Sequence, residues 1–119
     1  MSNIAESLDS VMQLEGAMAV ALVDSESGMT LGQQGGGVDL ELAAAGNTEV
    51  VRAKLKTMRS LELDDTIHDI LITLGKQYHI IRPLAQHPGV FLYLVLDKNH
   101  SNLALARRKV QDVESRLTL

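Results

Sequence analysis

Two stretches of the chain are apolar at every position. Residues 17–23 read Ala-Met-Ala-Val-Ala-Leu-Val, and residues 90–96 read Val-Phe-Leu-Tyr-Leu-Val-Leu. Both suit β-structure, and both are too short to cross a bilayer. A strand without a polar face has to be covered on both sides. We therefore expect these strands to lie side by side at the centre of a sheet, with helices above and below it.

Two segments near the ends of the chain have the spacing of amphipathic helices. In residues 3–14, apolar side chains follow Ser2 or Asn3, either of which could cap the helix, and Gly16 ends it. Near the C-terminus, one apolar stripe recurs at steps of three and four and predicts a helix that packs on the sheet. Its members are Leu103, Ala106, Val110, Val113 and Leu117.

The longest predicted helix runs from residue 38 to about residue 61. Residues 46–48 (Gly-Asn-Thr) could kink or break it, but we predict one helix because most other residues there are good helix formers. It carries two stripes, of which one should face the sheet and the other needs a further partner. The first comprises Leu40, Ala44, Val51, Leu55 and Met58, and the second, of smaller residues, comprises Leu42, Ala43, Gly46, Val50 and Ala53.

The remaining segments predict two hairpins. Residues 29–33 return from a glycine turn after the first central strand and are polar enough for a sheet edge. Residues 66–74 and 77–84 form a second hairpin around Gly75 and Lys76. The chain is thus predicted to be a single domain, residues 1–119, of the α/β (α+β) class. It should have a five-stranded, mostly antiparallel sheet sandwiched by helices, in the order α-β-β-α-β-β-β-α.

Strand 66–74 is predicted to form the outer edge of the sheet. It contains no proline or lysine to discourage pairing with another chain. Together with the second stripe of the long helix, this edge predicts a homodimer joined edge to edge. The expected interface residues are Leu42, Ala43, Gly46, Val50, Ala53, His68, Ile70 and Ile72.

Composition narrows the possible partners and compartments. The formal net charge is −4 with basic residues spread among acids, aromatic residues make up 3%, and tryptophan is absent, so we expect neither nucleic acid nor membrane insertion. The absence of cysteine excludes disulfides and thiolate metal sites. The first residues carry acids where a secretory signal would carry basic residues, so we expect a cytoplasmic protein.

Candidate catalytic and metal-binding groups do not form a recognisable constellation. Residues 32–37 have the glycine spacing of a phosphate loop, but Val38 and Asp39 stand where lysine and serine or threonine should follow. His68 and His79 could be neighbours across the second hairpin, although two histidines alone are more typical of strand residues than of a metal site. We expect no enzyme activity, no cofactor and no metal.

The order of these elements and the residues in them resemble the roadblock/dynein light-chain family, which includes a bacterial regulator of a gliding-motility GTPase. The matching pieces are residues 19–28, the Leu- and Ala-rich helix from Asp39, and residues 102–107. The resemblance covers nearly the whole chain. It implies a homodimer whose sheet continues across both subunits, acting as a scaffold or regulator for small GTPases or motor complexes.

Two hypotheses of function follow. The favoured one is a non-enzymatic dimeric module that binds a small Ras-like GTPase or another subunit of a polarity, motility or signalling complex. Its exposed charges Glu49, Arg52, Lys56 and Arg59 would select the partner, unless they are merely solvated. The alternative is a small-molecule-binding sensory domain, because such domains share this architecture. The sequence does not decide between a homodimer and a heterodimer.

Overall fold

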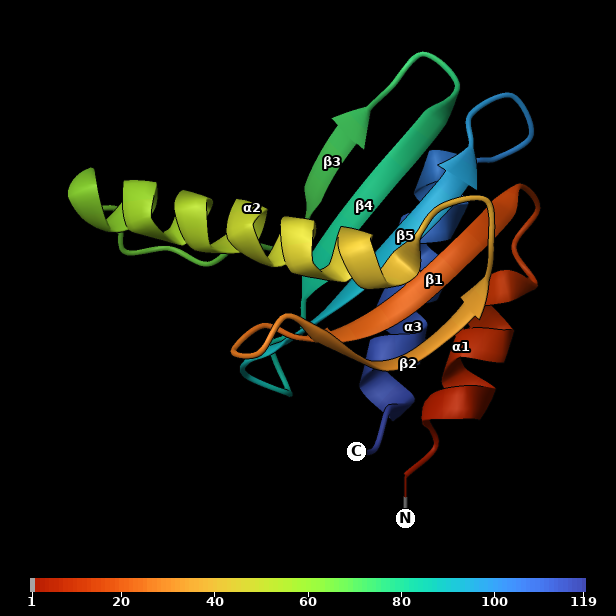
Figure 1. The fold of residues 1–119 in the computed structure, drawn as a ribbon, viewed down its shortest axis with the longest axis horizontal. Helices are drawn as coiled ribbons and strands as arrows, with labels where there is room; N and C mark the ends of the chain where they lie inside the picture. The colour runs from red at the N-terminus through yellow and green to blue at the C-terminus, as the bar shows by residue number, and fades with distance from the viewer. Residues whose placement is uncertain (1) are drawn as a thin grey trace.

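The structure is a computed structural model that describes residues 2–119. Its elements are, in chain order, α1 (Ile4–Met12), β1 (Ala17–Asp24), β2 (Met29–Gly35), α2 (Leu40–Ser60), β3 (Ile70–Thr73), β4 (Gln77–Pro83), β5 (Val90–Asp97) and α3 (Leu103–Arg116). The strands form one antiparallel sheet in the order β2-β1-β5-β4-β3 (Figure 1). The predicted fold class and element order are confirmed, and the two apolar strands β1 and β5 are neighbours at the centre.

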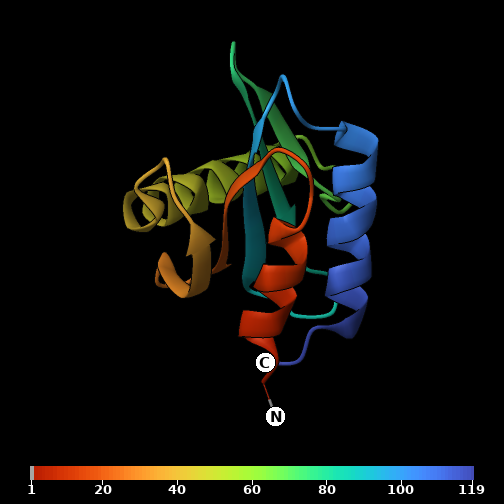
Figure 2. The ribbon, with the colours of Figure 1, turned by 90° about the vertical axis from the view of Figure 1, so that its right-hand side faces the viewer.

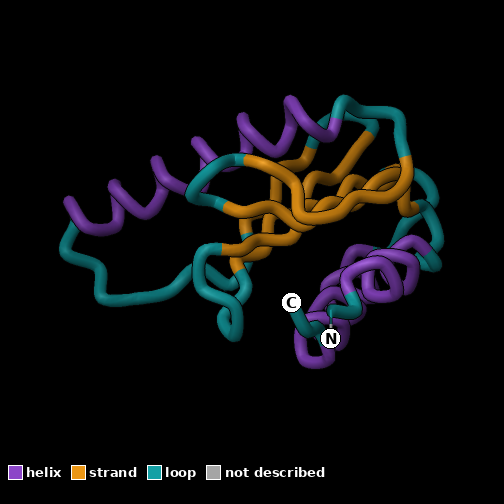
Figure 3. The backbone as a smooth tube through the Cα atoms, turned by 60° about the horizontal axis from the view of Figure 1, so that its bottom comes forward, coloured by secondary structure: helices purple, strands orange, loops and turns teal. Residues whose placement is uncertain are grey.

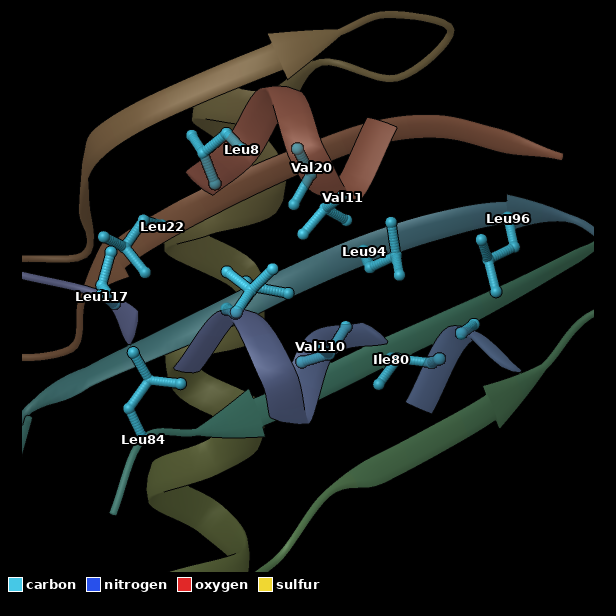
Figure 4. Packing of buried hydrophobic residues seen from close by; sticks show 13 residues of the cluster. Leu8, Val11, Val20, Leu22, Ile80, Leu84, Leu94, Leu96, Val110 and Leu117 are labelled. Atoms are coloured by element: carbon cyan, nitrogen blue, oxygen red, sulfur yellow. The ribbon is translucent and has the colours of Figure 1, made fainter. Parts of the chain in front are cut away.

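Helices cover the sheet on both faces. α1 and α3 lie next to each other on one face, and α2 crosses the opposite face (Figures 2 and 3). The face beneath α1 and α3 holds the larger hydrophobic cluster, in which side chains such as Leu94 and Val110 are almost fully buried (Figure 4). α1 approaches β2 closely because Gly32 lies beneath it. A Cβ at Gly32 would come within 2.6 Å of Cγ2 of Ile4.

Asn3 occupies the N-cap position of α1, but its side chain does not cap the helix. Its Oδ1 accepts a hydrogen bond from the backbone N–H of Thr118 at 2.7 Å, and its Nδ2 donates to the carbonyl oxygen of Arg116 at 2.8 Å. One of the two residues expected to cap the first helix therefore ties that helix to the C-terminal end of the chain.

α2 is a single unbroken helix, as predicted, and Asp39 caps it by accepting from the N–H of Leu42 at 3.1 Å. Thr48, within the suspected weak segment, is buried, and its hydroxyl donates to the carbonyl oxygen of Ala44 at 2.7 Å. This internal hydrogen bond satisfies the hydroxyl, so a polar residue can lie on the core side of the helix. Leu55 was expected on the core stripe but is 39% exposed, because the second half of α2 runs past the sheet (Figure 1).

Two strand boundaries differ from the prediction. β3 begins at Ile70 rather than residue 66, because Ile70 is opposite Ile81 and the same register would place His68 opposite Pro83, which has no N–H to donate. β2 continues to Gly35, two residues beyond the predicted end at residue 33. Gly35 has φ +84°, and a side chain there would collide with the backbone of Met18 and Ala19.

Candidate interaction surfaces

The histidine and acidic side chains of the described residues do not assemble into a metal centre. Across residues 2–119, no group of three or more His, Asp or Glu side chains is placed to hold a metal ion. His79 is opposite Ile72 in the hairpin, whereas His68 lies outside the ladder, so the suspected histidine pair is not formed there. Within the same residues, no helix combines the length and the apolar run that a membrane span needs.

The second half of α2 and the β3 edge form an open apolar region. After Val51, only Met58 of this helix is buried, while Leu55, Leu61 and Leu63 are 39%, 61% and 52% exposed. A groove of about 500 Å³ separates this part of α2 from the start of β3, with Val50, Met58, Leu63 and residues 65–70 along its walls. We call residues 50–63 the overhang. They comprise the second half of α2 and the turn that follows it.

The predicted dimer-interface residues lie on this open side of the molecule. Leu42 is 71% exposed, Gly46, Val50 and Ala53 are exposed, and Ala43 is half-buried. Ile70 and Ile72 are half-buried at the edge strand and pack against the core on the α2 face. His68 is exposed in the segment before β3 and lines the groove. The stripe and the edge are therefore free to contact a second chain, which leaves the predicted interface as an expectation.

The four charges expected to select a partner have different surroundings. Both Nη atoms of Arg52 are engaged, because Nη2 donates to the carbonyl oxygens of Ser25 and Glu26 at 2.7 Å each, and Nη1 contacts Glu49 at 3.3 Å. This arginine thus fastens α2 to the β1–β2 turn, a structural role that the sequence did not reveal. The side chains of Lys56 and Arg59, by contrast, make no hydrogen bond or ion pair with any residue in 2–119.

A buried ion pair on the opposite face was also missed in the sequence. Glu114 of α3 carries a charge, yet only 7% of its side chain is exposed. One carboxylate oxygen accepts from Nε of Arg82 at 2.7 Å, and the other accepts from the backbone N–H of Ala85 at 2.8 Å. Position 114 lies one residue from Val113 of the apolar stripe, which was the available signal that it could turn inward.

A larger groove, of about 970 Å³, lies beside this ion pair. It runs between α3, the end of β4 and residues 65–69. Three charged side chains on its walls are paired within the chain: Arg107 binds Asp69 through two hydrogen bonds of 2.9 and 3.2 Å, and Arg82 binds Glu114. The other polar residues on its walls are Asp65, Thr66, His68, Arg108 and Gln111, and a sensory pocket needs such groups to orient a ligand.

A hydrogen-bonded chain of polar side chains lies under the first half of α2. The hydroxyl of Tyr93 is 2.9 Å from Nδ1 of His79, and Nε2 of His79 is 2.8 Å from Oε1 of Gln77. Burial lowers the pKa of His79. Burial also raises the pKa of Tyr93, while a hydrogen bond with Asn47 of α2 acts in the opposite direction. This series of hydrogen bonds links α2 to the sheet through polar contacts that the sequence did not predict.

Comparisons with known proteins recover only structural likeness. No family model and no curated protein matches the sequence. Among solved structures, MglB from Myxococcus xanthus is 15% identical with a TM-score of 0.80, and the match covers 95% of this chain and 92% of that one. A Roadblock/LC7 domain from Streptomyces avermitilis is 10% identical with a TM-score of 0.80, covering 93% of this chain and 91% of that one.

A third structure is that of the gliding protein MglB from Thermus thermophilus. It is 15% identical with a TM-score of 0.72, and the match covers 94% of this chain and 88% of that one. At such identities the likeness establishes the fold alone. The family resemblance expected from the sequence is confirmed at that level: this chain has the fold of the Roadblock/LC7 domains and of MglB.

Proposed function

We propose that this protein is a non-enzymatic homodimeric scaffold or regulatory module of the cytoplasm, which binds or regulates a small Ras-like GTPase in a polarity, motility or signalling complex. The observation that carries the proposal is the unguarded β3 edge beside the overhang of α2. The likeness in fold to MglB, including a gliding protein, supports the motility setting. A small-molecule sensor has less support, because three of the charged groups of the larger groove, Asp69, Arg82 and Arg107, are already paired within the chain.

Self-association would join two β3 edges into one sheet. β3 has four residues, Ile-Leu-Ile-Thr, of which the first three are apolar. The second stripe of α2 offers small or apolar side chains that allow two helices to approach closely. Pairing of the edges would also cover Ile70 and Ile72. The exposed Leu42 lies on the same helix face, where it would become buried.

The dimer is tested by light scattering at micromolar concentration. The wild-type protein should have twice the monomer mass, and Gly46→Arg should reduce it to that of a monomer, because the position is open in the monomer and crowded in the dimer. Gly36→Arg is the matched control, since Gly36 is equally open and directly follows β2, which forms the sheet edge opposite β3. A wild-type monomer mass, or an unchanged mass for Gly46→Arg, would count against this interface.

Partner binding would use the overhang. Its exposed basic residues Lys54, Lys56 and Arg59 surround apolar side chains, an arrangement of an apolar centre and charged rim common in interfaces. The double variant Lys56→Glu with Arg59→Glu should lose capture of a small GTPase identified from a lysate loaded with a GTP analogue. Lys76→Glu with Arg108→Glu changes the net charge equally, elsewhere on the surface, and should retain it. Equal capture by both variants would place the binding surface away from the overhang.

A further inference from the structure

The charges of this protein are divided along the chain. Residues 52–119 carry eleven basic and seven acidic residues, whereas residues 1–51 carry no lysine or arginine at all. The first 51 residues contain eight acids: Glu6, Asp9, Glu15, Asp24, Glu26, Asp39, Glu41 and Glu49. Formal charge is therefore −8 over the first segment and +4 over the second, which together give the net −4.

The fold gathers the acidic segment on one side of the molecule. Residues 1–51 form α1, β1, β2 and the first half of α2, which are the red-to-yellow elements of Figure 1. One of these strands, β2, is the edge strand on this side of the sheet. The first basic residue, Arg52, reaches this side but is held on the carbonyl oxygens of the β1–β2 turn. The other basic residues belong to elements on the β3 side of the sheet and to α3. Among them, Arg116 of α3 lies near the start of α1, because its carbonyl oxygen accepts a hydrogen bond from Asn3.

The β2 edge has backbone groups free to pair with another strand. The N–H of Gly36 donates to the carbonyl oxygen of Met18, so the alternation of an antiparallel ladder directs the N–H and C=O of Gln33 and Gly35 away from β1. A bulge at Leu31 limits the regular edge to residues 32–35. The edge is thus short, and it suits a short extended segment rather than a long one.

A shallow groove lies along this edge. It encloses about 400 Å³ between α1 and β2, with Ile4, Ala5 and Glu6 on one wall and Leu31 and Gln33 on the other. Leu31 is 45% exposed, and Met29 at the start of the strand is 69% exposed. Apolar side chains of an added strand can pack on these residues, while its alternate side chains can reach Glu6, the carboxylate on the groove wall.

We propose that the β2 edge and α1 together dock an extended, basic segment of another protein as a sixth strand. Because the β2 side is acidic in every copy, pairing of two β2 edges would place like charges together, which disfavours a second copy of this chain as the occupant. The same acidity attracts lysine and arginine side chains. This surface is separate from the β3 edge and the overhang, so it would remain available in a dimer.

The test uses the full chain and a defined probe, a twelve-residue peptide of alternating lysine and valine. In NMR titrations at low salt, amide shifts should concentrate at residues 29–36 and in α1. A peptide of alternating glutamate and valine should cause none. Shifts confined to α3 or the overhang, or equal binding of both peptides, would overturn the proposal, and so would pairing of β2 with β2 of another copy.

Two variants locate the binding. Glu6→Lys with Asp9→Lys should weaken binding about tenfold, whereas Asp64→Lys with Asp112→Lys, which changes the net charge equally, should leave it unchanged. Gln33→Pro removes an outward N–H that β1 does not use and should also abolish strand addition while circular dichroism stays native. Undiminished binding by Gln33→Pro would overturn the proposal. Light scattering of the same samples reports the dimer independently, so either hypothesis can fail alone.

Discussion

On one face of the sheet, α1 and α3 lie together and bury a cluster that reaches from Leu8 to Leu117. On the other face, α2 buries Leu40, Ala44 and Val51 but then leaves the sheet, so that Ile70 and Ile72 at the β3 side are only half-buried. The first face is closed within a single chain. The second is complete only near β1 and β5, and its margin exposes apolar residues to any partner that can cover them.

This difference between the two faces indicates which residues should stabilise the monomer and which should contribute to association. Burial of apolar surface contributes most where it is complete, so residues of the closed face should dominate the free energy of unfolding of the monomer. Residues at the open margin should contribute less to the monomer and more to assembly. Substitutions matched across the two faces can break or sharpen this contrast.

The largest effect is expected for Leu94→Ala on the closed face. Leu94 is fully buried between both terminal helices and the central strands, so its truncation should reduce the free energy of unfolding by about 2–5 kcal/mol. Ile72→Ala on the open margin should reduce it by no more than about 1.5 kcal/mol in the monomer, but should weaken self-association. Urea denaturation of both variants in the Gly46→Arg background measures the monomer contributions. Equal losses at both sites would contradict the contrast.

The second effect concerns the ion pair of the closed face. Glu114→Ala leaves Arg82, whose side chain is 18% exposed, without its carboxylate, and it also leaves the N–H of Ala85 unpaired. We expect a loss of about 2–3 kcal/mol. Asp69→Ala breaks the more exposed pair with Arg107, which is 43% exposed, and should cost about 0–1 kcal/mol. Denaturant midpoints that rank the two variants in the opposite order would refute this assignment.

A smaller effect is expected for Arg52→Ala on the open face. The variant loses two charge-assisted hydrogen bonds to the β1–β2 turn, but the side chain is 49% exposed, so water replaces part of them. The expected loss is about 1 kcal/mol. Arg59→Ala is the control, since the side chain of Arg59 has no partner within residues 2–119, and the stability of this variant should match that of the wild type. Thermal unfolding of both variants distinguishes a tether from a solvated charge.

Sequence periodicity predicted the elements of this fold because apolar residues recur with the period of each element. It placed β1 and β5 at the centre since neither has a polar face, and it identified α2 as continuous. It failed where a single contact decides the outcome. The late start of β3 depends on a proline across the ladder, and the exposure of Leu55 depends on where the sheet ends beneath the helix.

The surface was harder to predict than the fold for the same reason. Periodicity identifies which residues share a helix face, but not which charges that face holds in place. Arg52 and Arg59 lie seven residues apart and look equivalent in the sequence. Only the folded chain shows that the turn after β1 reaches one of them.

The smallest effect concerns the pH dependence of the contact between α2 and the sheet. Neutral His79 can donate to Gln77 and accept from Tyr93, whereas protonated His79 donates at both nitrogens, so Tyr93 would have to reverse its role. Burial lowers the pKa of His79 in the folded protein, so the unfolded chain, in which histidine titrates near about 6.5, binds the proton first as pH falls. The contribution of His79 to the free energy of unfolding should therefore be fully present above about pH 6.5 and should decline as pH drops below that value.

His79→Gln cannot be protonated at this position. The difference in melting temperature between the wild type and this variant, followed from pH 8 to pH 5, isolates the contribution of His79 from those of the other histidines. A difference that stays constant over that range would show that His79 takes no part in the pH dependence of the α2 face.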